Sequence, residues 1–147
     1  MLVVSGCATQ QCTLIGTSVG ISVRVDTPLA GRVSAAELTA CWDGSCRTAK
    51  PELHLATTRA RQTCEGEACE AELERTGGKQ GFADVAGLPT APVKVELRLT
   101  GQSGEVVVER ELTVVPEERF PNGPACGAGG PQAAIAVSGS GEVSEEG

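Results

Sequence analysis

Cysteine is the residue type best suited to chemistry in this chain of 147 residues, which holds seven cysteines but only one histidine. Nucleophilic catalysis by a serine or a cysteine would have to use that histidine, His54, as its base. His54 lies between Leu53 and Leu55, so an alternating strand turns its side chain away from theirs and toward solvent. We therefore expect His54 to be a solvated strand residue without a catalytic role.

Carboxylates do not supply a clear acid–base pair either. Such a pair has to be held in a cleft with separated pKa values, and of the three aspartates, Asp26, Asp43 and Asp84, the second is accounted for as a turn former. The run of glutamates that begins at Glu65 fits a charged strand face, with a calcium site around Glu65 and Glu67 as the alternative. We predict that the protein is not an enzyme and binds neither a metal nor a cofactor.

Composition argues against several kinds of binding protein. Aromatic residues make up 2% of the chain, too few for platforms that stack sugars or nucleic-acid bases. The net charge of −7 disfavours binding to a phosphate backbone. Hydrophobic residues make up 40%, enough for a core, and the length suits one domain. We expect a folded domain that does not bind nucleic acid.

The first residues resemble an export signal. Val4-Ser5-Gly6-Cys7 resembles a bacterial lipobox, in which an apolar and two small residues precede the cysteine that is lipidated. The charged and long apolar parts of a full signal are not in this sequence, and a chance apolar start is the alternative. The resemblance implies that residues 1–11 are a truncated signal remnant and tether. It also implies that a lipid on Cys7 anchors the protein to the outer face of the cell membrane, or that the protein is secreted if it is not lipidated.

A lipidated Cys7 leaves six cysteines, an even number that is typical of a disulfide framework in a small exported domain. Cys41 and Cys46 share the spacing C-x4-C with Cys64 and Cys69. We predict a disulfide within each of these pairs. The alternative, a zinc site of four cysteines, needs reduced thiolates and usually a closer C-x2-C spacing.

A two-residue turn between the cysteines of each pair brings the two cysteines opposite each other, where they can form a disulfide. Asp43-Gly44 is a signal for a type I′ turn, and Gly66-Glu67 fits a type II′ turn. Counted outward from Asp43-Gly44, Cys41 and Cys46 form a non-hydrogen-bonded pair, whose Cα atoms approach to about 4.5 Å. That separation permits a disulfide.

The two hairpin registers make further predictions. In the first, Trp42 lies opposite Ser45 and one face pairs Glu37 with Lys50 and Thr39 with Thr48, while the other face carries Leu38, Ala40, Trp42, Ala49, Pro51, Leu53 and Leu55. In the second, Arg61 is expected opposite Glu72, Arg59 opposite Glu74 and Ala60 opposite Leu73. Opposite charges across a pair contribute about 0.2–1 kcal/mol each, so they are better evidence of register than a source of stability.

Cys12 and Cys126 remain, and a bond between them would join the two ends of the domain. A closure of that length stabilises by about 4–5 kcal/mol in the loop-entropy model, against about 2 for each short hairpin loop. We expect the loss of this third disulfide to cost the most.

Alternating apolar residues predict strands at 21–25, 93–100, 105–115 and 133–137, with breaks rich in glycine or proline between them. The breaks lie at 28–31, 76–81, 86–92 and 116–131. We predict an all-β fold, an Ig-like antiparallel β-sandwich of about seven to eight strands over residues 12–138. Residues 139–147 contain too little apolar surface to fold and are expected to form a disordered acidic tail.

Residues 81–92 and the strand after them resemble a segment common in bacterial Ig-like and transthyretin-like sandwiches. The C-W-D-G-x-C hairpin and the Pro-Asn-Gly-Pro-x-Cys loop resemble a group of small exported lipoproteins of high-GC, actinobacterial-type bacteria. The resemblance implies the fold and the location, and it implies no chemistry.

The function expected from these features is that of a non-enzymatic, lipid-anchored extracytoplasmic module that binds an envelope protein partner. Candidate partner-binding residues are Trp42 and Asp43 in the first hairpin and Phe120 and Asn122 in the long connection. Trp42 shares a face with apolar residues, which favours a place in the core. For the connection, the favoured interpretation is a crossing from one sheet to the other that carries the end-to-end disulfide. The alternative function is a secreted protease inhibitor that presents a disulfide-closed loop, at 42–45 or 65–68.

Overall fold

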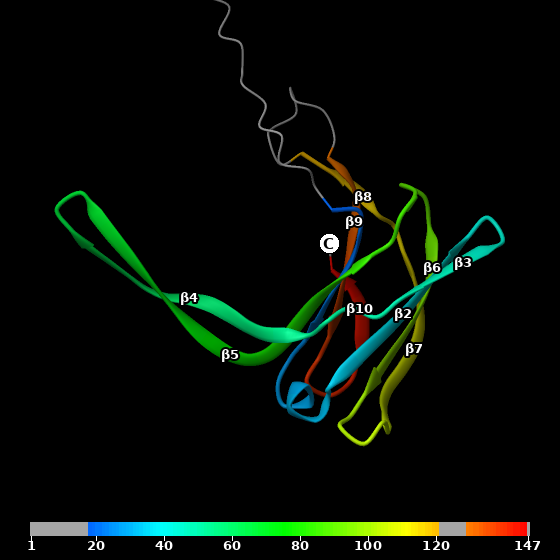
Figure 1. Cartoon of the computed structure of the whole chain (residues 1–147), viewed down its shortest axis with the longest axis horizontal. Coiled ribbons are helices and arrows are strands. Elements are labelled where there is room, and N and C mark those ends of the chain that lie inside the picture. Colours follow the sequence, from blue (N-terminus) through cyan, green and yellow to red (C-terminus); the bar gives the residue numbers. More distant parts are fainter. Residues whose placement is uncertain (1–17, 121–128, 147) are drawn as a thin grey trace, which may run out of the picture.

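The computed structural model describes residues 18–120 and 129–146, which form strands apart from one short 3-10 helix. The strands make two sheets (Figure 1). Sheet A has the order β10-β9-β1-β5-β4, with β8 beside β9, and sheet B has the order β3-β2-β6-β7. The elements are β1 (Gly20–Val25), η1 (Leu29–Arg32), β2 (Ala35–Trp42), β3 (Ser45–Ala49), β4 (His54–Glu65), β5 (Ala68–Asp84), β6 (Val93–Thr100), β7 (Val106–Val114), β8 (Glu117–Arg119), β9 (Gly130–Val137) and β10 (Val143–Glu146).

The two sheets enclose one hydrophobic core, because alternate side chains of their strands are apolar and point inward. In β6 the inward residues are fully buried, whereas the residues between them are exposed. The largest contributions to the core come from β1, β2, β6 and β9, through Ile21, Val23, Val25, Leu38, Val93, Val95, Leu97, Leu99, Ile135 and Val137. The prediction of an all-β sandwich is confirmed.

The sandwich differs from the expected one in two details. The described residues form ten strands where about seven to eight were expected, and β1 pairs with β9 in parallel, with Ile21 opposite Ala133. The additional strands, β8 and β10, are short and have no buried side chain, so apolar alternation does not mark them. The parallel pair joins segments more than a hundred residues apart, a relationship that local pattern does not encode.

The prediction that residues 139–147 form a disordered tail is wrong for Val143–Glu146. These residues form β10 and pair antiparallel with β9, with Val143 opposite Val137. Val143 packs half-buried against the core, and the backbone N–H of Val115 donates to Glu145 Oε2 at 2.6 Å. Pairing with an existing strand orders this acidic segment, although it has little apolar surface of its own.

The β2–β3 hairpin has the predicted register. Asp43 and Gly44 have φ angles of 49° and 75°, as a type I′ turn requires. Trp42 lies opposite Ser45 and Cys41 opposite Cys46, and the two cysteines form a disulfide with a Cα–Cα distance of 4.1 Å. The predicted type of turn, register and disulfide are confirmed here.

The polar face of this hairpin is also as predicted, but its apolar face ends earlier. The hydroxyl oxygens of Thr39 and Thr48 lie 3.0 Å apart, and Lys50 Nζ lies 3.9 Å from Glu37 Oε2. The chain leaves sheet B after Ala49, however, so Pro51, Leu53 and Leu55 do not continue the apolar face of β3. Leu55 lies in β4 of sheet A and is 49% exposed.

The predicted register of the β4–β5 hairpin is confirmed for the half nearest the turn. Cys64 lies opposite Cys69 and forms a disulfide with it, and Arg61 lies opposite Glu72. Gly66 has a φ of 61°, which the first position of a type II′ turn requires.

Farther from the turn, the predicted pairs Arg59–Glu74 and Ala60–Leu73 are wrong. The register shifts between Arg59 and Arg61, so that Arg59 lies opposite Leu73. Ala60 is the additional residue of a β-bulge, which moves the pairs of Arg59, Thr58 and Thr57 by one position.

Candidate interaction surface

The β4–β5 hairpin is the most prominent feature of the molecule outside its core. Figure 1 shows β4 and β5 leaving the sandwich together as a long twisted ribbon of two strands. We call residues 57–76 the arm. Its pairing begins at Thr57–Arg75 and ends at Glu65–Ala68, next to the turn.

A wide bulge at the base of the arm separates it from the rest of sheet A. Leu55 pairs with Lys79, and the next pair toward the turn is Thr57 with Arg75. Three residues of β5 therefore lie opposite Ala56 alone. Bulges bend a strand and increase its twist. This bulge lies where the ribbon leaves the sheet, and the predicted break at 76–81 is thus a bend within one continuous strand.

Hydrogen bonds and a glycine fix the shape of the bulge. Thr76 Oγ1 donates to the carbonyl oxygen of Ala56 at 3.3 Å and accepts from the N–H of Gly78 at 3.2 Å. Gly77 has a φ of +83°, and a Cβ atom there would lie 2.7 Å from Thr27 Cγ2. The base therefore requires glycine at this position both for its conformation and for its closeness to the loop after β1.

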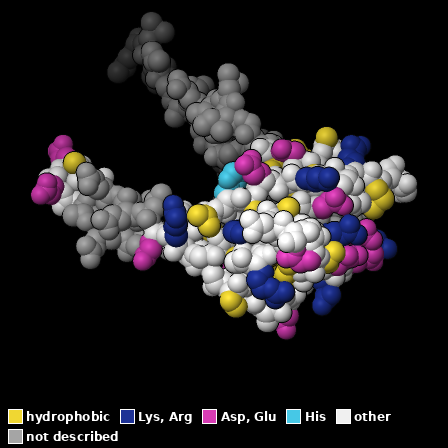
Figure 2. Space-filling view, turned by 60° about the horizontal axis from the view of Figure 1, so that its bottom comes forward, with side chains coloured by type: hydrophobic (Ala, Val, Ile, Leu, Met, Phe, Trp, Pro, Cys, Tyr) yellow, Lys and Arg dark blue, Asp and Glu magenta, His cyan; other side chains and the backbone are white. Residues whose placement is uncertain are grey.

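The tip of the arm is closed by the Cys64–Cys69 disulfide and is exposed. The six residues from Cys64 to Cys69 are exposed, and the turn between the cysteines carries Glu65 and Glu67. Figure 2 shows acidic side chains at this end, whereas acidic and basic side chains alternate over the sandwich. The tip thus offers a small, covalently closed acidic surface at a distance from the core.

Trp42 packs against the core, and the charged side chain of Arg47 lies over its ring. Its side chain is half-buried against the hydrophobic core, and Arg47 Cζ lies 5.2 Å from the centroid of its ring. Gly87 lies on the same side, where a Cβ atom would come within 3.9 Å of the indole. The neighbouring Asp43 is exposed in the turn. The structure therefore favours the interpretation of Trp42 as packing and leaves Asp43 accessible.

The structure describes only some of the remaining candidate residues. Phe120 follows β8 in sheet A and is 46% exposed, whereas the turn between β2 and β3 belongs to sheet B. The structure does not join these two predicted contact regions in one sheet. Asn122, the predicted lipidation site Cys7 and the predicted Cys12–Cys126 disulfide lie outside the described residues.

The four described cysteines are paired with one another. Both pairs have disulfide geometry, so their sulfurs are not the free thiolates that the zinc-site alternative requires. Among the side chains that the structure describes, which exclude those of 58–63 and 70–73, no group of three or more histidine, cysteine, aspartate and glutamate residues is arranged to hold a metal ion.

A shallow hollow of about 470 Å³ on the outer face of sheet A contains the histidine. His54 is exposed, as predicted, and its β5 partner Gln80 lies opposite Arg24 of β1. Arg24 forms ion pairs with Asp26, at 3.3 Å, and with Glu146 of β10. Across these three strands, His54 therefore lies next to the Gln80 position, and Arg24, which is paired with carboxylates, lies one strand farther along.

Sequence reasoning missed the arm and the hollow. It predicted the β4–β5 hairpin but not its projection, although residues 57–76 contain a signal for it: Leu73 is the only large apolar residue among them. A hairpin of that composition cannot cover a core. The hollow joins residues from β1, β4, β5 and β10, and no local pattern connects those segments.

Comparisons with known proteins provide no family for this chain. No protein-family model, no curated protein and no solved structure matches it. The described residues also contain no helix long and apolar enough to cross a membrane.

Proposed function

We propose that the protein is a non-enzymatic binding module, anchored outside the cytoplasm by a lipid on Cys7, that contacts an envelope protein partner through its arm. The observation that carries the proposal is the projection of β4 and β5 from the sandwich as a ribbon with a disulfide-closed tip. We also propose that the sandwich is of the Ig-like kind.

The arm contributes little to the folding of the sandwich. All described side chains at 57, 64–69 and 74–77 are exposed, and the buried core of sheet A resumes only at Ala56 and Ala83. Fixing a residue's backbone costs about 1–2 kcal/mol of conformational entropy. An isolated ribbon of two strands is at best marginally stable. An arm whose described side chains are all exposed is expected to have its use outside the fold, and contact with a partner is such a use.

The disulfide at the tip suits this role. It closes the ribbon at Cys64 and Cys69 and keeps the turn in one shape before a partner binds. Preorganisation lowers the entropy that is lost on binding. Because Glu65 and Glu67 are exposed there, we expect a partner with a basic surface and an association rate that falls as salt increases.

Two features support a location outside the cytoplasm. Two disulfides in one small domain are typical of oxidising compartments. The lipobox-like Val4-Ser5-Gly6-Cys7 supports a lipid anchor. Labelling with a fatty-acid analogue tests the anchor: the label should enter the wild-type protein and be lost in Cys7→Ala, and equal labelling of both would refute it.

Site-specific cross-linking tests the role of the arm. A photo-reactive residue at Glu67 should cross-link to a defined partner in the producing cells. One at Ser103, in the exposed turn between β6 and β7, is the matched control and should not. The adduct should also disappear in an arm-deleted variant, in which Asn-Gly replaces residues 58–74 and the Thr57–Arg75 pair remains to flank the new turn. Cross-links of equal yield from both positions would overturn the proposal.

The protease-inhibitor alternative draws support from the same closed tip. Only Glu65–Ala68 lie between the sulfurs, however, and a two-residue turn within them leaves little extended chain to occupy a substrate cleft. A panel of secreted proteases separates the two functions. Inhibition at micromolar protein that is lost in the arm-deleted variant would favour the inhibitor, and no inhibition would favour the binding module.

A further inference from the structure

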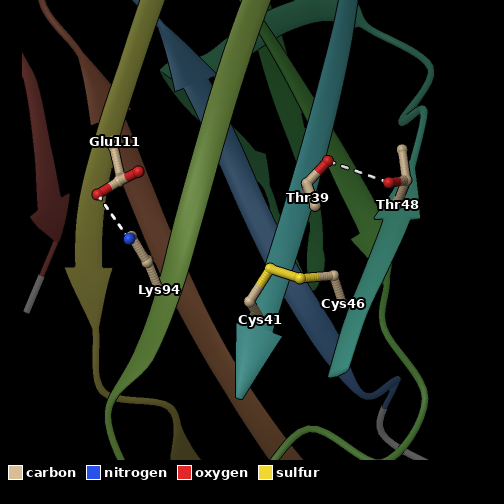
Figure 3. Close-up of a disulfide and its surroundings, with 6 residues drawn as sticks. All are labelled: Thr39, Cys41, Cys46, Thr48, Lys94 and Glu111. Carbon is tan, nitrogen blue, oxygen red and sulfur yellow. Dashed lines mark hydrogen bonds and ion pairs between the residues drawn. A yellow bond between two sulfur atoms is a disulfide. The ribbon is translucent and has the colours of Figure 1, made fainter. Parts of the chain in front are cut away.

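Both disulfides include exposed cysteines, and they differ in the charged groups around them. Leu38 and Ala40 of β2 are fully buried, so Cys41 lies on the opposite, outer face of sheet B with Thr39. Figure 3 shows the disulfide spanning β2 and β3 on this face. Its sulfurs therefore face away from the core.

The two sulfurs are not equivalent. Cys46 is exposed and belongs to β3, which is the last strand of sheet B, so no strand of the sheet lies beyond it. Cys41 is half-buried and belongs to β2, which has β3 on one side and β6 on the other. Thiol–disulfide exchange proceeds by attack of a thiolate on one sulfur while the other leaves. The open edge directs that attack to Cys46.

A lysine lies beside Cys41, whose sulfur is the leaving group when Cys46 is attacked. Lys94 of β6 is the direct cross-strand partner of Cys41, and directly opposed residues have Cβ atoms about 4.5–5.5 Å apart. Figure 3 shows the Lys94 side chain turned toward Glu111 of β7, with Nζ 3.1 Å from Oε1. The Lys94 side chain is 60% exposed, and an exposed ion pair contributes only about 0–1 kcal/mol. Its ammonium group can therefore turn toward a negative charge on Cys41.

Charged groups of both signs lie around the Cys41–Cys46 bond. The charges around the Cys64–Cys69 bond, at the tip of the arm, are different. Glu96 is next to Lys94 on the outer face, opposite Thr39, and Asp43 is in the adjacent turn. Cys64 and Cys69, by contrast, enclose Glu65 and Glu67. Carboxylates beside a sulfur oppose the approach of a thiolate and the formation of a second one.

We propose that Cys41–Cys46 is a thiol-exchange site that accepts a low-molecular-weight thiol on Cys46. The incoming thiolate forms a bond to Cys46 Sγ, the Cys41–Cys46 bond breaks, and its electron pair leaves on Cys41 Sγ as a thiolate near Lys94. A second equivalent of thiol releases the symmetric disulfide of that thiol and reduces the pair to two thiols. The inference does not depend on the proposed function of the arm.

Reaction with reduced glutathione tests the site. The oxidised protein is treated with glutathione, and samples are acidified, alkylated and mapped by mass spectrometry over time. Cys41–Cys46 should open about tenfold faster than Cys64–Cys69, with the first glutathione adduct on Cys46. Equal rates for the two bonds, or a first adduct on Cys41, would overturn the proposal.

Two lysine variants test the part played by the cation. Lys94→Gln should slow the opening of Cys41–Cys46 about threefold, because the leaving thiolate is less stabilised. Lys50→Gln is the matched control, since Lys50 is exposed near the same hairpin but pairs with Glu37, and it should react like the wild type. Glu111→Gln frees the ammonium group and should speed the reaction. Equal rates for Lys94→Gln and Lys50→Gln would refute the role of Lys94.

Trp42 supplies an independent signal. It is the only tryptophan of the chain and is adjacent to Cys41 in β2. Its fluorescence should change at the same rate as the Cys41–Cys46 bond opens, which mass mapping measures. A fluorescence change that follows Cys64–Cys69 instead would contradict the assignment.

Discussion

Arg47 covers the indole ring of Trp42, with its Cζ atom 5.2 Å from the ring centroid. The two residues come from the two strands of one hairpin, Trp42 half-buried against the core and Arg47 exposed on the edge strand β3. A guanidinium above an aromatic ring is attracted to it, by about 0.5–1 kcal/mol at an exposed site. The contact occupies ring surface that a partner would otherwise use.

Replacing Arg47 should therefore cost a small, measurable amount of stability. We expect Arg47→Ala to lower the free energy of unfolding by about 0.5–1 kcal/mol, measured by urea denaturation with Trp42 fluorescence as the signal. Arg32→Ala removes an exposed arginine from η1 and is the matched control, with an expected change near zero. Equal losses from both variants would show that the contact contributes nothing specific.

Removal of the arm should leave the sandwich intact. The described arm residues are exposed, so the variant in which Asn-Gly replaces residues 58–74 removes no described core side chain. We expect its free energy of unfolding to lie within about 1 kcal/mol of the wild type, since surface changes of this kind are small. Thermal and urea denaturation measure it, and a large loss would mean that the arm packs on the sandwich and supports the fold.

The sequence predicts best what is decided locally. Asp43-Gly44 favours one type of turn, and that turn alone determines which residues lie opposite each other, so the Cys41–Cys46 bond follows by counting. The β6 strand is equally clear, because four apolar residues alternate with polar ones and all four are buried. Fold class follows from the same local patterns.

What the sequence does not predict depends on distant segments. The bulge at Ala60 changes the partner of Arg59, and nothing in the composition of β4 marks it. β10 is ordered by its pairing with β9 and by Glu145, which accepts a hydrogen bond from Val115 of another part of the chain. The candidate surface is hard to predict for the same reason, since projection of the arm depends on where sheet A ends.

Gly77 at the base of the arm provides a test of how the ribbon is bent. Gly77→Ala places a Cβ atom in a conformation with φ +83° and 2.7 Å from Thr27 Cγ2. Gly104 has the same φ of +83°, and a Cβ atom there would meet nothing within 4 Å, so Gly104→Ala reports the conformational cost alone. We expect Gly104→Ala to lose about 1 kcal/mol and Gly77→Ala about 2–3 kcal/mol, measured by urea denaturation.

The informative quantity is the difference between the two glycine variants in their loss of free energy of unfolding. Contact with Thr27 adds a steric cost only if the bulge lies against the loop after β1. Thr27→Ser removes the Cγ2 methyl group and should restore part of the stability of Gly77→Ala. Equal losses from Gly77→Ala and Gly104→Ala, with no rescue by Thr27→Ser, would place the base of the arm away from that loop.

Glu145 should hold β10 against the end of β7. The backbone N–H of Val115 donates to Glu145 Oε2 at 2.6 Å, and Val115 directly follows β7 of sheet B, whereas β10 belongs to sheet A. Glu145→Ala leaves that N–H without its acceptor and should lower the free energy of unfolding by about 0.5–1.5 kcal/mol, since solvent replaces part of the interaction. Glu142→Ala removes an exposed carboxylate from the same segment, so it controls for the change in charge. Hydrogen exchange at the Val115 amide should accelerate in Glu145→Ala but not in Glu142→Ala. If both variants exchange there at the wild-type rate, the carboxylate does not link the two sheets, and β10 is held only by its pairing with β9.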